Sequence, residues 1–320
     1  DDAIADDARV WGPASGVGVE EVAQDFLKLL AQIKHGQVNP QLLRDALGIV
    51  ERRLVAASTA HLVLKKTRPQ TDFTEIGLRI RSWWVMVSIF TLAMLLSRNV
   101  SLFFFAFISF LALKEYLSII PTRRADRRVL LWAYLAIPLQ YFWAGIEWYG
   151  LFIIFIPIYL FLFLPLCMVI IGETRDFLRS AGTLHWGLMT MVFSISHLAY
   201  LLVLPQTGNP GAGGSGLLLY LVFLTQSNDV SQFLWGKSCG RRKIVPRVSP
   251  NKTWEGFLGG VGTTTVLAVV LSRLLTPLSL PLAFAAGILI STAGFVGDIT
   301  ISAIKRDIGV KDSGNLLPGH

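Results

Sequence analysis

Residues 151–171 read LFIIFIPIYLFLFLPLCMVII, a stretch that contains no charged side chain. A membrane-spanning α-helix needs about 20 consecutive apolar residues, because each residue adds only about 1.5 Å to its length. This stretch therefore predicts a transmembrane helix, and it sets the class of fold in which the rest of the chain is interpreted.

The composition extends this prediction to the whole chain. Apolar residues make up 53% of the 320 residues and charged residues 16%, and the mean hydropathy is +0.56. Soluble domains carry about a quarter charged residues, so lipid is the expected main solvent of this chain. The composition excludes an intrinsically disordered chain, a coiled coil and a disulfide-stapled secreted fold. The two cysteines, Cys167 and Cys239, show no metal or redox spacing.

Apolar runs of comparable length recur along the sequence. Eight of them predict transmembrane helices, at residues 83–97, 100–113, 129–147, 151–171, 184–204, 217–234, 257–271 and 280–297. Tryptophans lie near the ends of several runs, as in the interfacial belts of membrane proteins: Trp83, Trp84, Trp132, Trp148, Trp186 and Trp254. The expected fold is all-α, a polytopic helical integral membrane protein.

Positive charge alternates between the segments that flank these runs. At least two Lys or Arg residues occur in every second segment, whereas the segments between them have one or none; the basic segments are 65–82, 114–128, 172–183, 235–256 and 298–311. The positive-inside rule places the basic segments and the N-terminus in the cytoplasm.

The N-terminal 80 residues differ from the rest. Apolar residues recur at helical spacing within 22–33 and 42–54, which predicts a cytoplasmic helical prefix at 1–80 before a transmembrane domain at 81–320. The first 25 residues hold seven acids and one base, a net charge of −6. Because the whole chain has a net charge of +8, the other residues together have a net charge of +14. Bases placed beside membrane runs suit anionic lipid and anionic substrates, and nucleic acid is not an expected partner.

Polar side chains interrupt two apolar runs near their cytoplasmic ends. Thr225, Asp229 and Gln232 are spaced i, i+4 and i+7 and share one helix face. Polar groups in a lipid-facing helix are expensive, so they indicate either a functional site or a stripe of hydrogen bonds between helices. Both interpretations stay open for these residues.

The last run repeats this arrangement with stronger charges. Asp298, Ser302, Lys305 and Arg306 are spaced i, i+4, i+7 and i+8, and Gly294, one turn earlier, would allow another helix to approach closely. A carboxylate followed by a hydroxyl and two cations suits a metal with a polyphosphate, because Mg²⁺ takes one or two carboxylates plus phosphate oxygens. The alternative is a structural pair between Asp298 and Arg306.

A helix start is expected between these two runs, in the segment Ser249-Pro250-Asn251-Lys252-Thr253-Trp254-Glu255-Gly256. Ser249 as the N-cap and Pro250 in the first turn predict that a helix begins here. The free N–H groups of a helix N-terminus attract an anion, and Lys252 and Thr253 add a cation and a donor. The segment is therefore a candidate phosphate-binding site.

Three ordered motifs within residues 225–320 resemble the phosphatidate cytidylyltransferase family, also called CDP-diacylglycerol synthases. The first motif is Asp229 with Gly236 and the basic residues after it, and the second is the segment 249–256. The third comprises Gly297-Asp298, Ser302-Ala303-Ile304-Lys305-Arg306, Lys311-Asp312 and Leu317-Pro318-Gly319-His320. Residues 80–225 agree with the family in character only, and residues 1–80 lie outside the resemblance.

The chain departs from the family pattern in two places. The family commonly has small residues and a Tyr shortly after the Asp, where this chain has Val230-Ser231-Gln232-Phe233, which indicates a divergent bacterial-type branch. The pattern also continues beyond the His with Gly-Gly and Asp-Arg-x-Asp and a final membrane helix. We therefore expect the sequence to be C-terminally incomplete, with a ninth transmembrane helix missing.

The resemblance implies that CTP and phosphatidate react to give CDP-diacylglycerol and pyrophosphate, at the cytoplasmic face of a bacterial inner membrane. It implies Mg²⁺ held by Asp229, Asp298 and Asp312, with a second cation such as K⁺ as a further option. The residues expected to act in catalysis are Asp298, Lys305, Arg306, Asp312 and His320. Those expected to bind substrate are Ser249, Asn251, Lys252, Thr253, Ser302 and Lys311.

Other classes of function stay open on the sequence alone. A transporter or flippase of an anionic lipid or nucleotide would line its pathway with the same acids, although no internal repeat occurs and the acids cluster at one membrane face. A catalytically inactive scaffold that recruits a partner through residues 1–80 and a CTP-dependent lipid kinase are further alternatives. The expected partners are CTP, phosphatidate and membrane lipid. A homodimer, in which a second copy of the chain is the partner, is a further option.

Overall fold

The computed structural model describes residues 97–120, 123, 126–205 and 212–309, together with Val85 and Phe90. Within these residues the chain is helical, and no β-strand occurs apart from one isolated antiparallel bridge between Lys243 and Thr253. All helices named below belong to one compact unit within residues 92–316. The predicted prefix at 1–80, its boundary at residue 81 and most of the first apolar run lie outside the described residues. The all-α class is confirmed for the described part of the chain.

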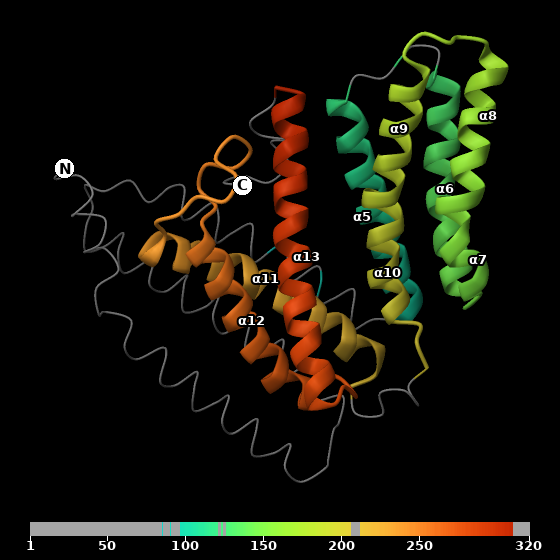
Figure 1. Cartoon of the computed structure of the whole chain (residues 1–320). Helices are drawn as coiled ribbons and strands as arrows, with labels where there is room; N and C mark the ends of the chain where they lie inside the picture. The colour runs from blue at the N-terminus through green and yellow to red at the C-terminus, as the bar shows by residue number, and fades with distance from the viewer. Residues whose placement is uncertain are drawn as a thin grey trace, which may run out of the picture. The chain divides into compact units, whose positions relative to one another are not determined.

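The first group of helices spans residues 98–201 and runs from teal to yellow-green in Figure 1. It consists of α5 (Arg98–Ile119), α6 (Arg127–Gly145), α7 (Tyr149–Ile154), α8 (Phe161–Ile171), α9 (Phe177–Gly187) and α10 (Ser194–Leu201). The π-helical segments η2 (Phe155–Leu160) and η3 (Leu188–Phe193) join α7 to α8 and α9 to α10 without a break. In η2, Pro157 has no N–H, and in a regular α-helix its ring would collide with the carbonyl of the preceding turn, so a wider turn suits this position.

Apolar packing and polar bonds both hold the helices of this group together. Leu113 and Leu188 are fully buried between them. The Tyr141 hydroxyl on α6 donates a hydrogen bond to the Phe105 carbonyl oxygen on α5 at 2.9 Å. Bonds of this kind matter for helices in lipid, because lipid tails supply no hydrophobic drive for helix association.

The second group comprises α11 (Gly213–Cys239), α12 (Trp254–Leu275) and α13 (Leu280–Asp307), drawn from yellow-orange to red in Figure 1. Each of the three helices contacts the other two. Glycine on α12 allows α11 to approach closely, since a Cβ added at Gly256 would lie only 2.8 Å from the Gln232 carbonyl oxygen. A larger residue at this position would push the two helices apart.

Asn228 on α11 is fully buried and links all three helices of the second group. Its Oδ1 accepts hydrogen bonds from Ser291 Oγ on α13 at 2.5 Å and from Thr264 Oγ1 on α12 at 3.3 Å. Its Nδ2 lies beside Gly294, where an added Cβ would be 3.1 Å away. The close helix approach predicted at Gly294 is therefore confirmed. The same network fixes the helical turn that carries the neighbouring Asp229.

Four of the described helices are long and apolar enough to cross a membrane, namely α5, the continuous helix Tyr149–Ile171, α12 and α13. Helices also form at the predicted runs 129–147, 184–204 and 217–234, but they are not among these four. The eight predicted spans are therefore not confirmed, and the cytoplasmic N-terminus stays a prediction. The predicted belt tryptophans of the described part have exposed rings, as contact with lipid requires: Trp132, Trp148, Trp186 and Trp254. These features indicate a membrane protein.

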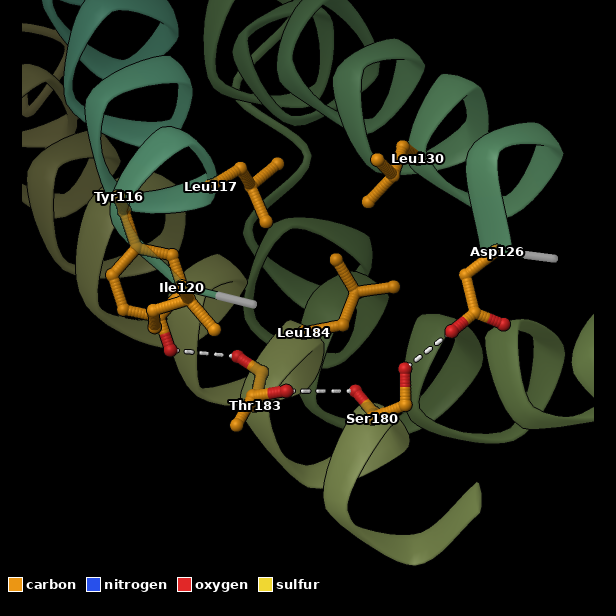
Figure 2. A pocket seen from close by; sticks show the side chains of 8 residues that line it. All are labelled: Tyr116, Leu117, Ile120, Asp126, Leu130, Ser180, Thr183 and Leu184. Carbon is orange, nitrogen blue, oxygen red and sulfur yellow. Dashed lines mark hydrogen bonds between the residues drawn. The ribbon is translucent and has the colours of Figure 1, made fainter. Parts of the chain in front are cut away.

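A buried ion pair fixes the loop between α5 and α6. The Asp126 side chain is 2% exposed and accepts hydrogen bonds from Arg123 Nε at 2.7 Å and Nη2 at 2.8 Å. Ser180 on α9 also donates to Asp126, and Figure 2 shows both residues beside a small pocket. Arg123 Nη1 donates to the carbonyl oxygens of Glu173 and Arg175 at 3.0 and 2.5 Å. The hydrogen bond with Asp126 raises the pKa of the Arg123 guanidinium above its ordinary value, so the pair stays ionised.

We expect Asp126→Asn to destabilise the protein, because it removes the charge that pairs with a largely buried guanidinium. Breaking a buried ion pair costs about 3–5 kcal/mol, and the amide keeps part of the bonding, so we expect a loss of about 2 kcal/mol or more in the free energy of unfolding. Thermal unfolding in detergent micelles measures this loss.

Asp176→Asn is the matched control for this variant. The Asp176 side chain is 63% exposed and lies 3.9 Å from Arg175, so its substitution should change the free energy of unfolding by less than about 0.5 kcal/mol. Equal losses in the two variants would contradict a structural role for the Arg123–Asp126 pair.

Candidate active site

An ion pair between Lys252 and Asp298 joins the loop before α12 to α13. The Lys252 ammonium donates to Asp298 Oδ2 and reaches Gln232 Oε1 on α11 at 3.4 Å. It also lies 5.9 Å from the centre of the Phe295 ring, a distance at which an aromatic face attracts a cation. The side chains of Lys252 and Asp298 are 25% and 48% exposed. The pair is therefore accessible to a ligand.

Asp229 adds a second carboxylate to this pair. It is exposed on α11, one residue after the buried Asn228, and its charge interacts with those of Asp298 and Lys252. The ion pair thus joins one acid on α13 to one base from the intervening loop, and a second acid, on α11, is near enough for its charge to act on both. Two negative charges and one positive charge leave a net −1, which favours a further cation beside them.

The loop that carries Lys252 folds back on itself between α11 and α12. The Ile244 N–H donates to the Lys252 carbonyl oxygen at 3.1 Å, and the Trp254 N–H donates to the Arg242 carbonyl oxygen at 2.9 Å. These two bonds form a short antiparallel ladder. The ladder fixes the backbone at Lys252, so the direction of its side chain is set by the loop as well as by its partners.

The helix start predicted at Ser249 is wrong. Helix α12 begins at Trp254, and its N-cap is Thr253, whose hydroxyl accepts a hydrogen bond from the N–H three residues later at 3.2 Å. The ladder keeps Thr253 extended, with φ −123° and ψ 155°, so the helix cannot begin before it. Lys252 therefore directly precedes the N-cap, and Ser249 lies in the turn that leads to it.

Glu255 closes this loop, a role that the sequence had not predicted. Its carboxylate accepts hydrogen bonds from the backbone N–H groups of Arg241 at 3.0 Å and Arg242 at 3.2 Å. Both residues directly follow Gly240, the C-cap of α11, so Glu255 ties the start of the loop to the first turn of α12. The sequence feature that could have indicated this role is that Glu255 is the one acid in the segment 249–256 and had no partner assigned to it.

The other predicted residues of α13 follow Asp298 along the helix. The Ser302 hydroxyl donates to the Asp298 carbonyl oxygen at 2.7 Å, so it is engaged by its own helix. Arg306 Nε donates to the Val248 carbonyl oxygen at 3.4 Å, which places its guanidinium against the Lys252 loop. Lys305, half-buried, comes directly before it. Asp298 itself pairs with Lys252, so the alternative pairing of Asp298 with Arg306 is not observed.

The remaining predicted residues divide into two sets. Ser249 is half-buried and Asn251 is exposed in the turn before α12, and Thr253 is 4% exposed with its hydroxyl used as the helix cap. Lys311, Asp312 and His320 lie outside the described residues. Substrate binding by the first set and the roles of the second set stay predictions.

The donors around Asp298 suit a hard divalent cation. Asp229 and Asp298 offer carboxylate oxygens and Gln232 an amide oxygen, which are ligands that Mg²⁺ and Ca²⁺ accept. In the described part of the chain no group of three His, Cys, Asp or Glu side chains could hold a metal ion. Mg²⁺ usually binds one or two carboxylates together with water and substrate phosphates, so the residues present fit this cation when a phosphate ligand is bound.

Comparisons with known proteins agree with the sequence motifs. A model of the cytidylyltransferase family matches residues 77–320. The uncharacterized protein YnbB of Escherichia coli (strain K12) is 46% identical over 279 residues, which cover 87% of this chain and 91% of that protein. The phosphatidate cytidylyltransferase of Bacillus subtilis (strain 168) is 42% identical over 109 residues, 33% of this chain and 40% of the relative. That of Mycobacterium leprae (strain TN) is 37% identical over 149 residues, 45% of this chain and 44% of the relative.

The two named phosphatidate cytidylyltransferases are thus matched over less than half of their length. The family model, in contrast, covers well over half of this chain and includes every described helix of the candidate site. The chain belongs to the cytidylyltransferase family.

Proposed function

We propose that the protein is a phosphatidate cytidylyltransferase, which converts CTP and phosphatidate into CDP-diacylglycerol and pyrophosphate in phospholipid biosynthesis. The observation that carries the proposal is the Lys252–Asp298 ion pair, with the charge of Asp229 acting on it, in a member of the cytidylyltransferase family. The relatives that bear the name phosphatidate cytidylyltransferase support it. We place the site at the cytoplasmic face of a bacterial inner membrane, because basic loops flank it.

In the proposed reaction a phosphate oxygen of phosphatidate attacks the α-phosphorus of CTP. A bond forms between this oxygen and the α-phosphorus, the bond from the α-phosphorus to the oxygen that bridges to the β-phosphate breaks, and pyrophosphate leaves. The substrates themselves supply the nucleophile and the leaving group. The protein therefore contributes positioning and charge neutralisation, which is what a site of Asp, Lys and Arg side chains can provide.

Positive side chains would hold the negatively charged reactants. Lys252 is the best placed, because its ammonium already lies beside Asp298. Lys305 and Arg306 extend positive charge along α13, and Arg306 contacts the Lys252 loop. We propose that polar groups near Lys252 and the following part of the chain complete the substrate site: Ser249, Asn251, Thr253, Ser302 and Lys311.

We propose that Asp229 and Asp298, together with Asp312, hold Mg²⁺. When bound, Mg²⁺ neutralises phosphate charge and so favours the departure of pyrophosphate. Without a ligand, Lys252 supplies the positive charge beside Asp298, and its release from Asp298 would let it bind a phosphate. A second cation such as K⁺, and orientation of the reacting groups or proton transfer by His320, belong to the same proposal.

Asp298→Asn is expected to lower the cytidylyltransferase activity about 100-fold or more, because it removes a carboxylate that would hold Mg²⁺ at the reacting phosphates. Incorporation of radiolabelled CTP into lipid by the purified full-length protein measures the activity. Chromatography of the product distinguishes CDP-diacylglycerol from the phosphorylated lipid that a CTP-dependent kinase would make.

Asp307→Asn is the matched control on the same helix. Asp307 is exposed at the end of α13, and its substitution should leave the activity within about twofold of the wild type. Full activity in Asp298→Asn would disprove the metal assignment. If the wild type incorporated no label from CTP into lipid, the proposed function would be disproved.

Asp229→Asn should weaken the response to Mg²⁺ more than the maximal rate. Loss of one carboxylate near the cation is expected to raise the half-saturating Mg²⁺ concentration about tenfold. Titration of initial rates with Mg²⁺ at saturating CTP measures this shift. An unchanged Mg²⁺ titration in the variant would show that Asp229 does not contact the cation.

A further inference from the structure

Gln232 on α11 is a buried polar residue whose amide oxygen faces Lys252 and is not among the groups to which the proposed function assigns Mg²⁺ or substrate. It is 5% exposed, and its Oε1 accepts a hydrogen bond from the Lys252 ammonium at 3.4 Å. Its Nε2 is also buried, and in the described part of the chain it has no hydrogen-bond partner. The oxygen of the carboxamide is thus hydrogen-bonded, whereas its NH₂ group has no partner in the described part of the chain.

The charge of Lys252 determines how this carboxamide lies. An ammonium group only donates hydrogen bonds, so the amide oxygen has to face it and the NH₂ group has to point away. A buried donor without a partner destabilises the folded state. For folding alone, an apolar side chain of the same length would serve better at position 232, which indicates that the amide oxygen has another purpose.

The packing around Gln232 does not require an amide either. Its Cγ lies against Gly260 of α12, where an added Cβ would collide with it. A methionine has the same two methylene groups and would fill the space beside Gly260 equally well. The oxygen that faces Lys252 is the feature that methionine lacks.

We propose that Gln232 is a positioning residue for Lys252 during nucleotide binding, an inference that rests on the proposed function. In the structure Asp298 and Gln232 share the Lys252 ammonium. If Asp298 held a divalent cation, Lys252 would lose its carboxylate partner, and the Gln232 oxygen would keep the ammonium beside the incoming polyphosphate.

The decisive variant is Gln232→Met, studied by equilibrium binding and by unfolding. Affinity for CTP with Mg²⁺, measured by calorimetric titration without lipid, should fall about three- to tenfold, the size expected for one lost hydrogen bond to an ammonium at this distance. The unfolding temperature in the same detergent should stay the same or rise, because the unpaired amide N–H is removed. Gln226→Met is the matched control, since Gln226 is exposed on the same helix, and it should change neither quantity.

A double-mutant cycle with Lys252 shows whether Gln232 acts through that residue. In the background of Lys252→Met, the substitution Gln232→Met should cause no further loss of CTP affinity. A second variant, Gln232→Ala with Gly260→Ala, refills part of the vacated volume with a methyl group and should show the same loss of affinity as Gln232→Met. It keeps the test valid if methionine packs poorly.

Two results would overturn the inference. A lower unfolding temperature with unchanged CTP affinity would make Gln232 a structural contact between helices, and an undiminished effect in the Lys252→Met background would show that it does not act through Lys252. Wild-type protein that binds CTP but transfers no cytidylyl group would disprove the proposed function. The CTP affinities of the variants would in that case still test the role of Gln232 in nucleotide binding. Wild-type protein that does not bind CTP would disprove both.

Discussion

The ion pair between Lys252 and Asp298 depends on the close approach of three helices, and the candidate site depends on the pair. An ionised side chain near lipid is stable only when it has a partner or water. Asp298 is the first charged residue along α13, and its partner comes from a loop that precedes another helix. The loop can deliver Lys252 to that point only because α11, α12 and α13 are held at short distances.

Several local features act together to hold these distances. Gly256 lets α11 and α12 touch, and Asn228 hydrogen-bonds α12 and α13 from the buried face of α11. Thr253 ends the loop by capping α12, and Glu255 closes it by accepting two backbone N–H groups. Because Glu255 binds backbone groups of Arg241 and Arg242, the loop is fixed without using their guanidinium groups as anchors. The loop can therefore be rigid and strongly basic at once, as a site for a polyphosphate requires.

Sequence reasoning found the charged residues but not their geometry. Asp229 and Asp298 stood out because charges in apolar runs are rare, and Lys252 because it lies near a helix start. The start itself was misplaced, since Ser-Pro is a common helix opening, whereas here Ser249 lies in a turn and a backbone ladder with residues 242–244 keeps Thr253 extended. Helical spacing placed Gln232 and Asp229 on one face, but it could not show that glycines on α12 cover Gln232 and leave Asp229 exposed. The partners of Glu255 lie 13 and 14 residues earlier, beyond the reach of any local pattern.

Two of the ion pairs in the described part of the chain, Arg123–Asp126 and Lys252–Asp298, differ in their electrostatic surroundings. In the Arg123–Asp126 pair the side chains are 15% and 2% exposed, and each guanidinium nitrogen has a partner. In the Lys252–Asp298 pair they are 25% and 48% exposed, and Asp229 adds a negative charge that Lys252 alone does not balance. A pair that only stabilises the fold gains nothing from a neighbouring unbalanced acid beside lipid. The second pair is thus the more exposed of the two, and a cation with its phosphate ligand could reach it, as the proposed function requires.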